Sequence, residues 1–333
     1  MSKRKPAQIH GVLVIDKPLG LTSRAVVNKI AWLLGDKRCG HAGTLDPQAS
    51  GVLLIAFGEA TKCVRWLMEA EKTYETTIHF GQATDSDDAA GQIVAHLPIP
   101  AYDREIIAAA LPKPGWIQQI PPAVSALQKD GVRDYERVRR GEIIDRPARE
   151  VWLSDVQALD LTSVTVNLRV SCGAGFYVRS LARDLGQALG TLGHVGALRR
   201  TTAGGLGLEI AHVLPEIEAL PLEQRRELLL PIEEVLRALL PHLAVDDATA
   251  LQLRQGKLPD IVGELQMPSA VPRPPPAHAA SEPPGILILD QAGHAVCLAQ
   301  DVEGQLKVLR GFVDHQPLQV PTDEVQADVA ESA

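Results

Sequence analysis

The sequence predicts an α+β protein with a mixed, largely antiparallel sheet, followed by a small β-rich domain. Three observations support this fold class. The chain of 333 residues is long enough for two domains. Short apolar or alternating runs that are typical of strands recur along it, between segments with helical spacing of apolar residues. Past residue 238 the pattern changes to short strands, so we expect domains over 1–238 and 239–315 and a tail over 316–333.

Local signals place the elements of the first domain. Thr22 or Ser23 can cap a helix, whose apolar residues recur at helical spacing until Gly35 ends it. A polar segment rich in Gly and Pro, residues 40–51, is expected to be a loop that leads into a buried strand at 52–57. The other expected elements are strands at 10–16, 72–81, 115–119 and two over 150–172, and helices at 59–68, 103–111 and after 173.

The second domain begins with an apolar run over 239–245 and a short helix that carries Leu251 and Leu253. Strands are expected at 285–290, 294–300 and 305–310. The intervening segment, 263–284, contains seven prolines between Pro268 and Pro284, and this composition predicts an extended, disordered loop. The tail is polar and acidic, which also predicts disorder.

Composition excludes several classes of protein. No apolar run approaches the roughly 20 residues of a membrane span, and the basic N-terminus is not followed by the apolar stretch of a secretory signal. The four cysteines are far apart and form no C-x-x-C pair, which argues against a zinc site and a disulfide framework. We therefore expect a cytoplasmic protein.

The net charge of −8 is unevenly distributed. From residue 209 onward the chain has 8 Lys/Arg and 20 Asp/Glu, a net charge of −12, so the first 208 residues have 25 and 21, a net charge of +4. The mildly basic part contains the 40–51 segment, and this permits RNA binding there.

The 40–51 segment contains the best candidate for a nucleophile. Pro47 fixes its own φ and favours an extended backbone at Asp46. A carboxylate held in this way is oriented, as a nucleophile requires. An Asp-Pro pair taken alone is more typical of a turn in which the aspartate caps the next element.

The whole segment reads Gly-His-Ala-Gly-Thr-Leu-Asp-Pro-x-Ala-Ser-Gly, which resembles the catalytic motif of the TruB family of tRNA pseudouridine synthases. The resemblance implies that Asp46 is the catalytic aspartate and that the reaction converts uridine-55 in the T loop of tRNA to pseudouridine. It also implies a pseudouridine-synthase catalytic domain, a PUA-like RNA-binding domain after it, and neither a cofactor nor a metal.

Two further motifs match the family. The opening Asp-Lys-Pro resembles its N-terminal motif, in which the lysine lines the active site; alone, Lys17 would be a solvated lysine. The Lys-x-Tyr pattern implies that Tyr74 lies against the target base, since an aromatic ring suits an unstacked base. A lone strand tyrosine would more often belong to the core. The resemblance also suggests that His41 fills the space that the base leaves.

The segment Gly-Phe-Tyr-Val-Arg-Ser-Leu resembles the family's Gly-Thr-Tyr-Ile-Arg-Ser-Leu motif, with Phe176 in place of the common threonine. Arg179 could cap a helix or form an ordinary ion pair. The functional interpretation is that its two parallel donors hold Asp46 ionised. In the later Leu-Arg-Arg-Thr match, Leu198 would form a wall of the uracil pocket, and Arg199 and Arg200 would reach phosphate.

Two segments allow two interpretations each. The acidic stretch 84–88 could bind a metal, but a solvated, self-capping turn is favoured, with Asp85 making a structural hydrogen bond. The segment of about 122–150 contains six arginines and four acids between Arg133 and Arg149. It is either a solvated helix with internal ion pairs or an insertion that grips RNA; the resemblance favours the insertion.

The sequence therefore predicts a monomeric enzyme that acts on the T-arm of tRNA, without an obligatory protein partner or a membrane. Two alternatives remain: a guide-dependent synthase of the dyskerin type, and a non-catalytic protein that binds or folds tRNA. Retention of Asp46, Tyr74 and Arg179 argues against a decayed site.

Overall fold

The computed structural model describes residues 9–123, 128–129, 132–133, 146–259, 264–268, 285–302 and 305–313. No helix in these ranges is long and apolar enough to cross a membrane. Most of the arginine-rich segment of 122–150, most of the proline-rich segment of 263–284 and the tail of 316–333 lie outside the described residues, as do the predictions made for them.

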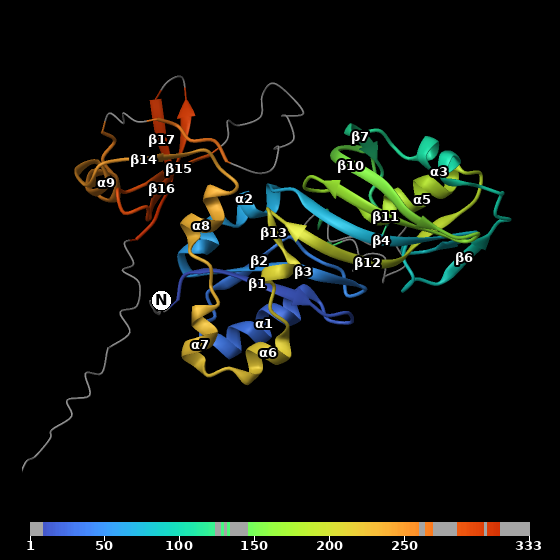
Figure 1. Ribbon diagram of the computed structural model, residues 1–333, viewed down its shortest axis with the longest axis horizontal. Coiled ribbons are helices and arrows are strands. Elements are labelled where there is room, and N and C mark those ends of the chain that lie inside the picture. Colours follow the sequence, from blue (N-terminus) through green and yellow to red (C-terminus); the bar gives the residue numbers. More distant parts are fainter. Residues whose placement is uncertain are drawn as a thin grey trace, which may run out of the picture.

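A large mixed sheet dominates the structure (Figure 1). Its strand order is β1-β3-β12-β4-β11-β10-β7, with β2 beside β3 and β13 beside β12. All pairs are antiparallel except β3 and β12, which are parallel over three residue pairs. The strands are β1 (Gly11–Lys17), β2 (Cys39–Ala42), β3 (Ala49–Phe57), β4 (Lys72–Phe80), β7 (Gly115–Gln119), β10 (Arg149–Leu161), β11 (Thr165–Cys172), β12 (Gly193–Ala203) and β13 (Leu206–Gly207).

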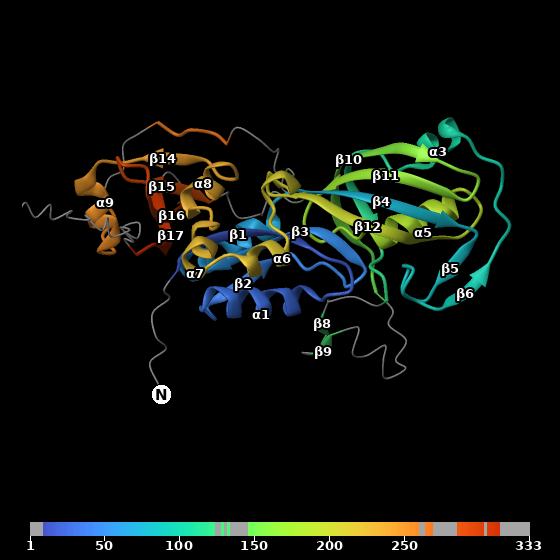
Figure 2. The same cartoon turned by 60° about the horizontal axis from the view of Figure 1, so that its bottom comes forward.

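Strands β1 and β3 are apolar at nearly every position because helices and strands cover both of their faces. One set of alternate residues, including Leu13 and Leu53, packs against Val26 and Ile30 of α1 and against α6. Figure 2 shows α1, α6 and α7 on this side. The helices of this part are α1 (Ser23–Leu34), α2 (Val64–Glu69), α6 (Leu214–Ala219), α7 (Leu222–Glu227) and α8 (Ile232–Arg237), with 3-10 turns η1 (Gly58–Cys63) and η2 (Leu208–Ile210).

The far half of the sheet has its own core. Ile78 of β4 and Leu168 of β11 pack against Leu181 and Leu185 of α5, and Ile107 of α3 joins them. The remaining elements here are α3 (Arg104–Ala110), α5 (Val178–Ala188) and the pair β5 (Gln82–Thr84) and β6 (Ile93–His96). Strands β8 (Gln128–Lys129) and β9 (Val132–Arg133) form a separate two-stranded pair. The two halves of the sheet meet where β3 runs beside β12.

A four-stranded sheet follows in the order β14-β15-β16-β17. One of its faces packs on helix α9, and the other shares a core with the large sheet, in which Leu287 and Phe312 meet Trp66 and Leu67 of α2. Its elements are β14 (His242–Ala244), α9 (Asp247–Arg254), β15 (Ile286–Leu289), β16 (Ala295–Val302) and β17 (Gln305–Gly311). The predicted α+β fold class, with its mixed sheet and smaller C-terminal sheet, is confirmed.

The expected loop over 40–51 is shorter than predicted. Cys39–Ala42 forms strand β2, which pairs antiparallel with β3, and β3 already begins at Ala49. The prediction relied on the polar and glycine-rich composition of the segment. Strand pairing uses backbone N–H and C=O groups, which every residue except proline offers in full, so such residues can also form a strand. The loop proper spans residues 43–48, and His41 lies in a strand.

Candidate active site

The loop of residues 43–48 is fixed from both sides. The Ser23 hydroxyl donates to the Leu45 carbonyl and accepts from the Leu45 amide, both at 2.9 Å, and the Leu45 side chain is buried. On the other side of Asp46, the Gly20 amide donates to the Pro47 carbonyl at 2.8 Å. Asp46 itself accepts a backbone bond from Ala49 at 3.0 Å. The aspartate thus has little backbone freedom although its side chain is 42 % exposed.

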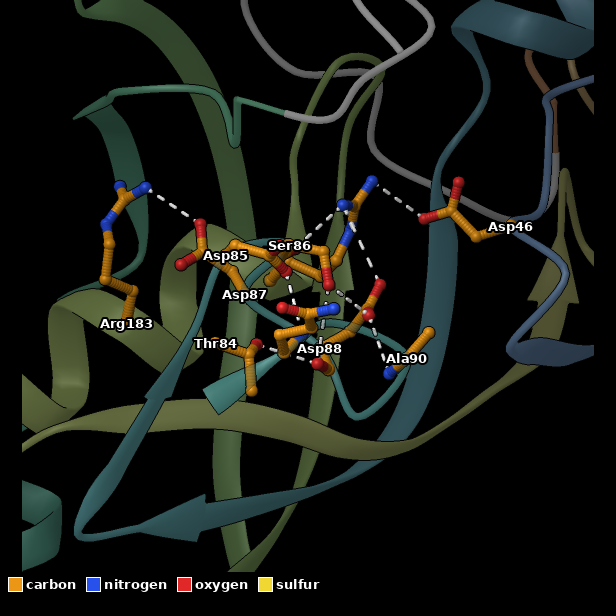
Figure 3. A network of polar contacts seen from close by, with 10 residues as sticks. Asp46, Thr84, Asp85, Ser86, Asp87, Asp88, Ala90 and Arg183 are labelled. Carbon is orange, nitrogen blue, oxygen red and sulfur yellow. Dashed lines mark hydrogen bonds and ion pairs between the residues drawn. The ribbon is translucent and has the colours of Figure 1, made fainter. Parts of the chain in front are cut away.

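Arg179, at the start of α5, forms an ion pair with Asp46. Its Nη2 lies 2.9 Å from the Asp46 Oδ2 atom, and its own side chain is 6 % exposed (Figure 3). The Nη1 atom donates to the Ser86 carbonyl at 3.0 Å and lies 3.8 Å from the Asp88 carboxylate. Ser86 and Asp88 therefore hold the guanidinium in place, while its other nitrogen orients the Asp46 carboxylate.

The residues that hold Arg179 belong to the acidic stretch 84–88. The buried Asp88 carboxylate accepts from the Ser86 hydroxyl at 2.6 Å and from the Ala90 amide at 3.0 Å (Figure 3). Asp85 accepts from the Gln92 amide at 2.9 Å, in the structural role expected for it. The turn is self-capping as predicted, but the expectation that it is merely solvated is wrong, because Asp88 is buried beside Arg179. Asp88 was not predicted from the sequence, since no local signal relates it to a residue 91 positions later.

Within the described part of the chain, no group of three or more His, Cys, Asp or Glu side chains is arranged to hold a metal ion. The metal interpretation of 84–88 thus has no support in the geometry.

A cavity of about 520 Å³ lies in front of this ion pair. Asp46, Tyr74, Arg179, Leu198 and Arg200 all line it, so the structure brings these predicted residues together. Burial raises the pKa of the Tyr74 phenol, while the nearby Arg200 opposes this shift. The phenol consequently stays protonated at neutral pH. Residues of α2 and of the segment 173–178 also line the cavity.

Lys17 does not line the cavity, contrary to the prediction. Its side chain is fully buried, and its Nζ donates to the carbonyls of Pro18 at 2.9 Å and Leu21 at 2.7 Å. Burial lowers the pKa of Lys17 to about 8, and the nearby Asp46 carboxylate opposes this shift. Lys17 therefore supports the backbone of the loop that follows β1, and its predicted contact with substrate stays a prediction.

Arg200, which was predicted to reach a phosphate, is buried in this structure, and the phosphate contact stays a prediction. Arg200 is 1 % exposed, and it donates from Nε to the Val52 carbonyl at 2.6 Å and from Nη2 to the Gly43 carbonyl at 3.1 Å. Arg199, its neighbour on β12, is half-buried and forms a two-point ion pair with Asp16 at 2.7 and 3.2 Å. A phosphate contact of Arg199 stays a prediction.

His41 is half-buried in β2 and does not line the cavity. Its predicted role of filling the space left by the base stays a prediction.

Comparison with known proteins decides the family. The model of the TruB family pseudouridylate synthase N-terminal domain matches residues 31–178, and the model of the tRNA pseudouridylate synthase B C-terminal domain matches residues 179–237. The chain belongs to the TruB family. The TruB models thus cover Asp46, Tyr74 and Arg179.

Individual TruB relatives match over most of the chain. The tRNA pseudouridine synthase B of Ruegeria pomeroyi is 46% identical over 256 residues, which are 76% of this chain and 84% of the relative. The protein of the same name from Paracoccus denitrificans is 37% identical over 313 residues, 94% of this chain and 99% of the relative.

Among solved structures, the archaeal box H/ACA sRNP Nop10-Cbf5 complex contains a similar chain. It has a TM-score of 0.67 and 22% identity, with coverage of 93% of this chain and 89% of that chain. At this identity the likeness concerns the fold, which the TruB chain shares.

Proposed function

We propose that this protein isomerises uridine-55 in the T loop of tRNA to pseudouridine, with Asp46 as the reacting carboxylate and without a cofactor. The observation that carries the proposal is the 2.9 Å ion pair of Asp46 with Arg179 at the wall of a cavity that Tyr74 also lines. Membership of the TruB family, and relatives named tRNA pseudouridine synthase B, support the substrate.

The reaction explains these residue types. The N1–C1′ bond of the nucleotide breaks, the base rotates, and a C5–C1′ bond forms, so no outside group or electron is transferred. Asp46 starts the reaction by adding to the sugar or the base, or by taking a sugar proton. Arg179 orients this carboxylate: one guanidinium nitrogen lies 2.9 Å from Asp46, and the Ser86 carbonyl holds the other nitrogen in the same plane.

Tyr74 and Leu198 receive the base in this proposal. An aromatic ring can stack on a base that has left the helix, and the apolar Leu198 can close the opposite wall. The volume of about 520 Å³ is in the range of small-molecule sites, roughly 300–1,000 Å³. Extrusion of the base costs a few kcal/mol, which contacts with the rest of the T-arm must offset.

The remaining assignments are proposals of the same kind. We place the enzyme in the cytoplasm as a monomer that needs no obligatory protein partner. The residues over 239–315 would act as a PUA-like RNA-binding unit, and the arginine-rich segment of about 122–150 would grip the T-arm. Arg199 would contact a phosphate.

The test is to incubate purified protein with an unmodified tRNA transcript and to map pseudouridine. We expect product at position 55 without guide RNA or added protein, and none from Asp46→Asn, with folding and tRNA affinity retained. Asp103→Asn is a matched control, because Asp103 caps α3 and asparagine caps equally well. Product that required a guide would favour the dyskerin-type alternative. tRNA binding without product would favour the non-catalytic one.

A further inference from the structure

Three buried cations lie around the loop that carries Asp46: Lys17, Lys72 and Arg200, which are 0, 5 and 1 % exposed. Within the described residues none of the three forms an ion pair with a carboxylate. Each donates to backbone carbonyls, and for Lys72 these are Met68 and Ala70, at the end of α2. Burying a charge without a counter-ion costs free energy of desolvation. Buried charges next to a reactive carboxylate therefore point to a function.

The cations are also close to one another. Lys72 and Arg200 approach the same point of the loop from two sides. A Cβ atom placed on Gly43 would lie 3.4 Å from the Arg200 Nη1 and 3.7 Å from the Lys72 Cε. Both side chains line the cavity together with Tyr74, and Lys17 is close enough to Asp46 for their charges to interact.

Nearby groups leave this cluster positively charged. Burial lowers the pKa of both lysines to about 8, and the Arg200 charge lowers them further, yet both remain largely protonated at pH 7. Glu69 faces Lys72 but pairs with Arg65 at 2.9 Å. The Cys172 thiol is neutral because burial raises its pKa to about 12. Asp46 faces Lys17 but is paired with Arg179.

We infer that Lys17, Lys72 and Arg200 stabilise the negative charge that forms on the uracil ring while it is detached or altered in the cavity. This inference rests on the proposed function. When the N1–C1′ bond breaks, its electron pair leaves with the base and spreads over the ring. C5 then returns a pair to C1′ and loses its proton, and N1 gains one. Addition of Asp46 to the ring would also place negative charge there.

The placement suits an anion that must rotate. A hydrogen bond holds one atom at one angle, whereas buried charges at the cavity wall attract the ring over a range of orientations. Each side chain is at most 5 % exposed, which leaves little surface for a contact with RNA phosphate. The three residues thus have an electrostatic and positioning role and need not touch the reacting atoms.

The test compares Lys72→Met with wild type on tRNA that carries either uridine or 5-fluorouridine at the target. Fluorine withdraws electrons and stabilises the ring anion, so the reaction depends less on electrostatic stabilisation by the protein. With uridine, we expect the variant to break the N1–C1′ bond about 10- to 100-fold more slowly than wild type in single turnover. With 5-fluorouridine, this reduction in rate should be several-fold smaller. Lys72→Arg should retain most of the rate, and tRNA affinity should not change.

Lys29→Met is the control, because Lys29 is an exposed lysine paired with Glu218 on the far side of α1. Equal slowing of both substrates by Lys72→Met would assign Lys72 a purely structural role and overturn the inference. Weaker tRNA binding with a changed salt dependence would indicate a phosphate contact and would also overturn the inference. Should Lys72→Met not fold, Lys17→Met provides the same comparison. An inactive wild type would instead reject the proposed function.

Discussion

The Arg179 guanidinium joins Asp46 to Ser86: one nitrogen lies 2.9 Å from the Asp46 carboxylate and the other donates to the Ser86 carbonyl at 3.0 Å. The catalytic candidate on the 43–48 loop is thus tied to a turn on the other half of the large sheet. Because a guanidinium is planar, fixing one edge to a backbone carbonyl also fixes the angle of the other edge.

This geometry makes replacement of Arg179 by lysine far from conservative. Lysine keeps the charge but cannot bind Asp46 and Ser86 in one plane, and a misplacement of about 1 Å can cost roughly 100-fold in rate. We expect single-turnover rates to fall in the order wild type, Arg179→Lys, Arg179→Ala. The dissociation constant for tRNA should change less than the rate. A lysine variant with the wild-type rate at saturating enzyme would contradict the pairing.

Asp88 should influence the rate through Arg179. Asp88→Asn removes the charge 3.8 Å behind the guanidinium but leaves an oxygen for the Ser86 hydroxyl and the Ala90 amide. We expect single-turnover rates about 10-fold lower, roughly the effect of 1.4 kcal/mol on the barrier. Asp85→Asn is the control, since the Asp85 carboxylate accepts from the Gln92 amide and should tolerate the change. Equal effects of the two variants would argue against a specific role of Asp88.

Gly51 allows β3 and β12 to approach. Its φ is +102°, and an added Cβ would lie 2.1 Å from the Arg200 carbonyl oxygen. Gly51→Ala should therefore lower the free energy of unfolding by more than about 2 kcal/mol, measured by urea denaturation. Gly40→Ala, where a Cβ would meet nothing within 4 Å, should change it by less than about 0.5 kcal/mol. Similar losses in both variants would disprove the steric argument.

Lys72 should make stability depend on pH. Its native pKa is about 8 and its ordinary value is 10.5. Between these values the unfolded chain binds the proton and the native one does not, so stability rises with pH. The free energy of unfolding of wild type minus that of Lys72→Met should increase from pH 8 to 10, by at most about 1.4 kcal/mol per pH unit. The same difference for Lys29→Met should stay flat.

Local features of the fold could be predicted from the sequence. The first helix has its cap at Thr22, which accepts from the Ala25 amide, and ends at Gly35 with a φ of +71°. Both signals lie within a few residues of the element they define. The Asp46–Arg179 pair was predicted through the family resemblance, because nothing in their local sequences relates two residues 133 positions apart.

The two neighbouring arginines show what was overlooked. Side chains on a strand alternate between its faces, so Arg199 and Arg200 cannot both point to solvent once 193–203 is a strand. The same role was predicted for both because no secondary structure was assigned to this segment from the sequence. Burial of Lys17 could not be foreseen, since it depends on β3 and the 43–48 loop covering the end of β1.

Helix α2 has two faces with different neighbours. Residues Arg65, Met68 and Glu69 line the cavity, while Trp66 and Leu67 belong to the core shared with the C-terminal sheet. Because of this shared core, we expect the parts before and after residue 238 to fold together. The two parts should melt in one cooperative transition, and a chain cut after residue 238 would expose Trp66 and lose the support of the cavity wall. The thermal stability of the catalytic cavity thus depends on strands more than 200 residues further along the chain.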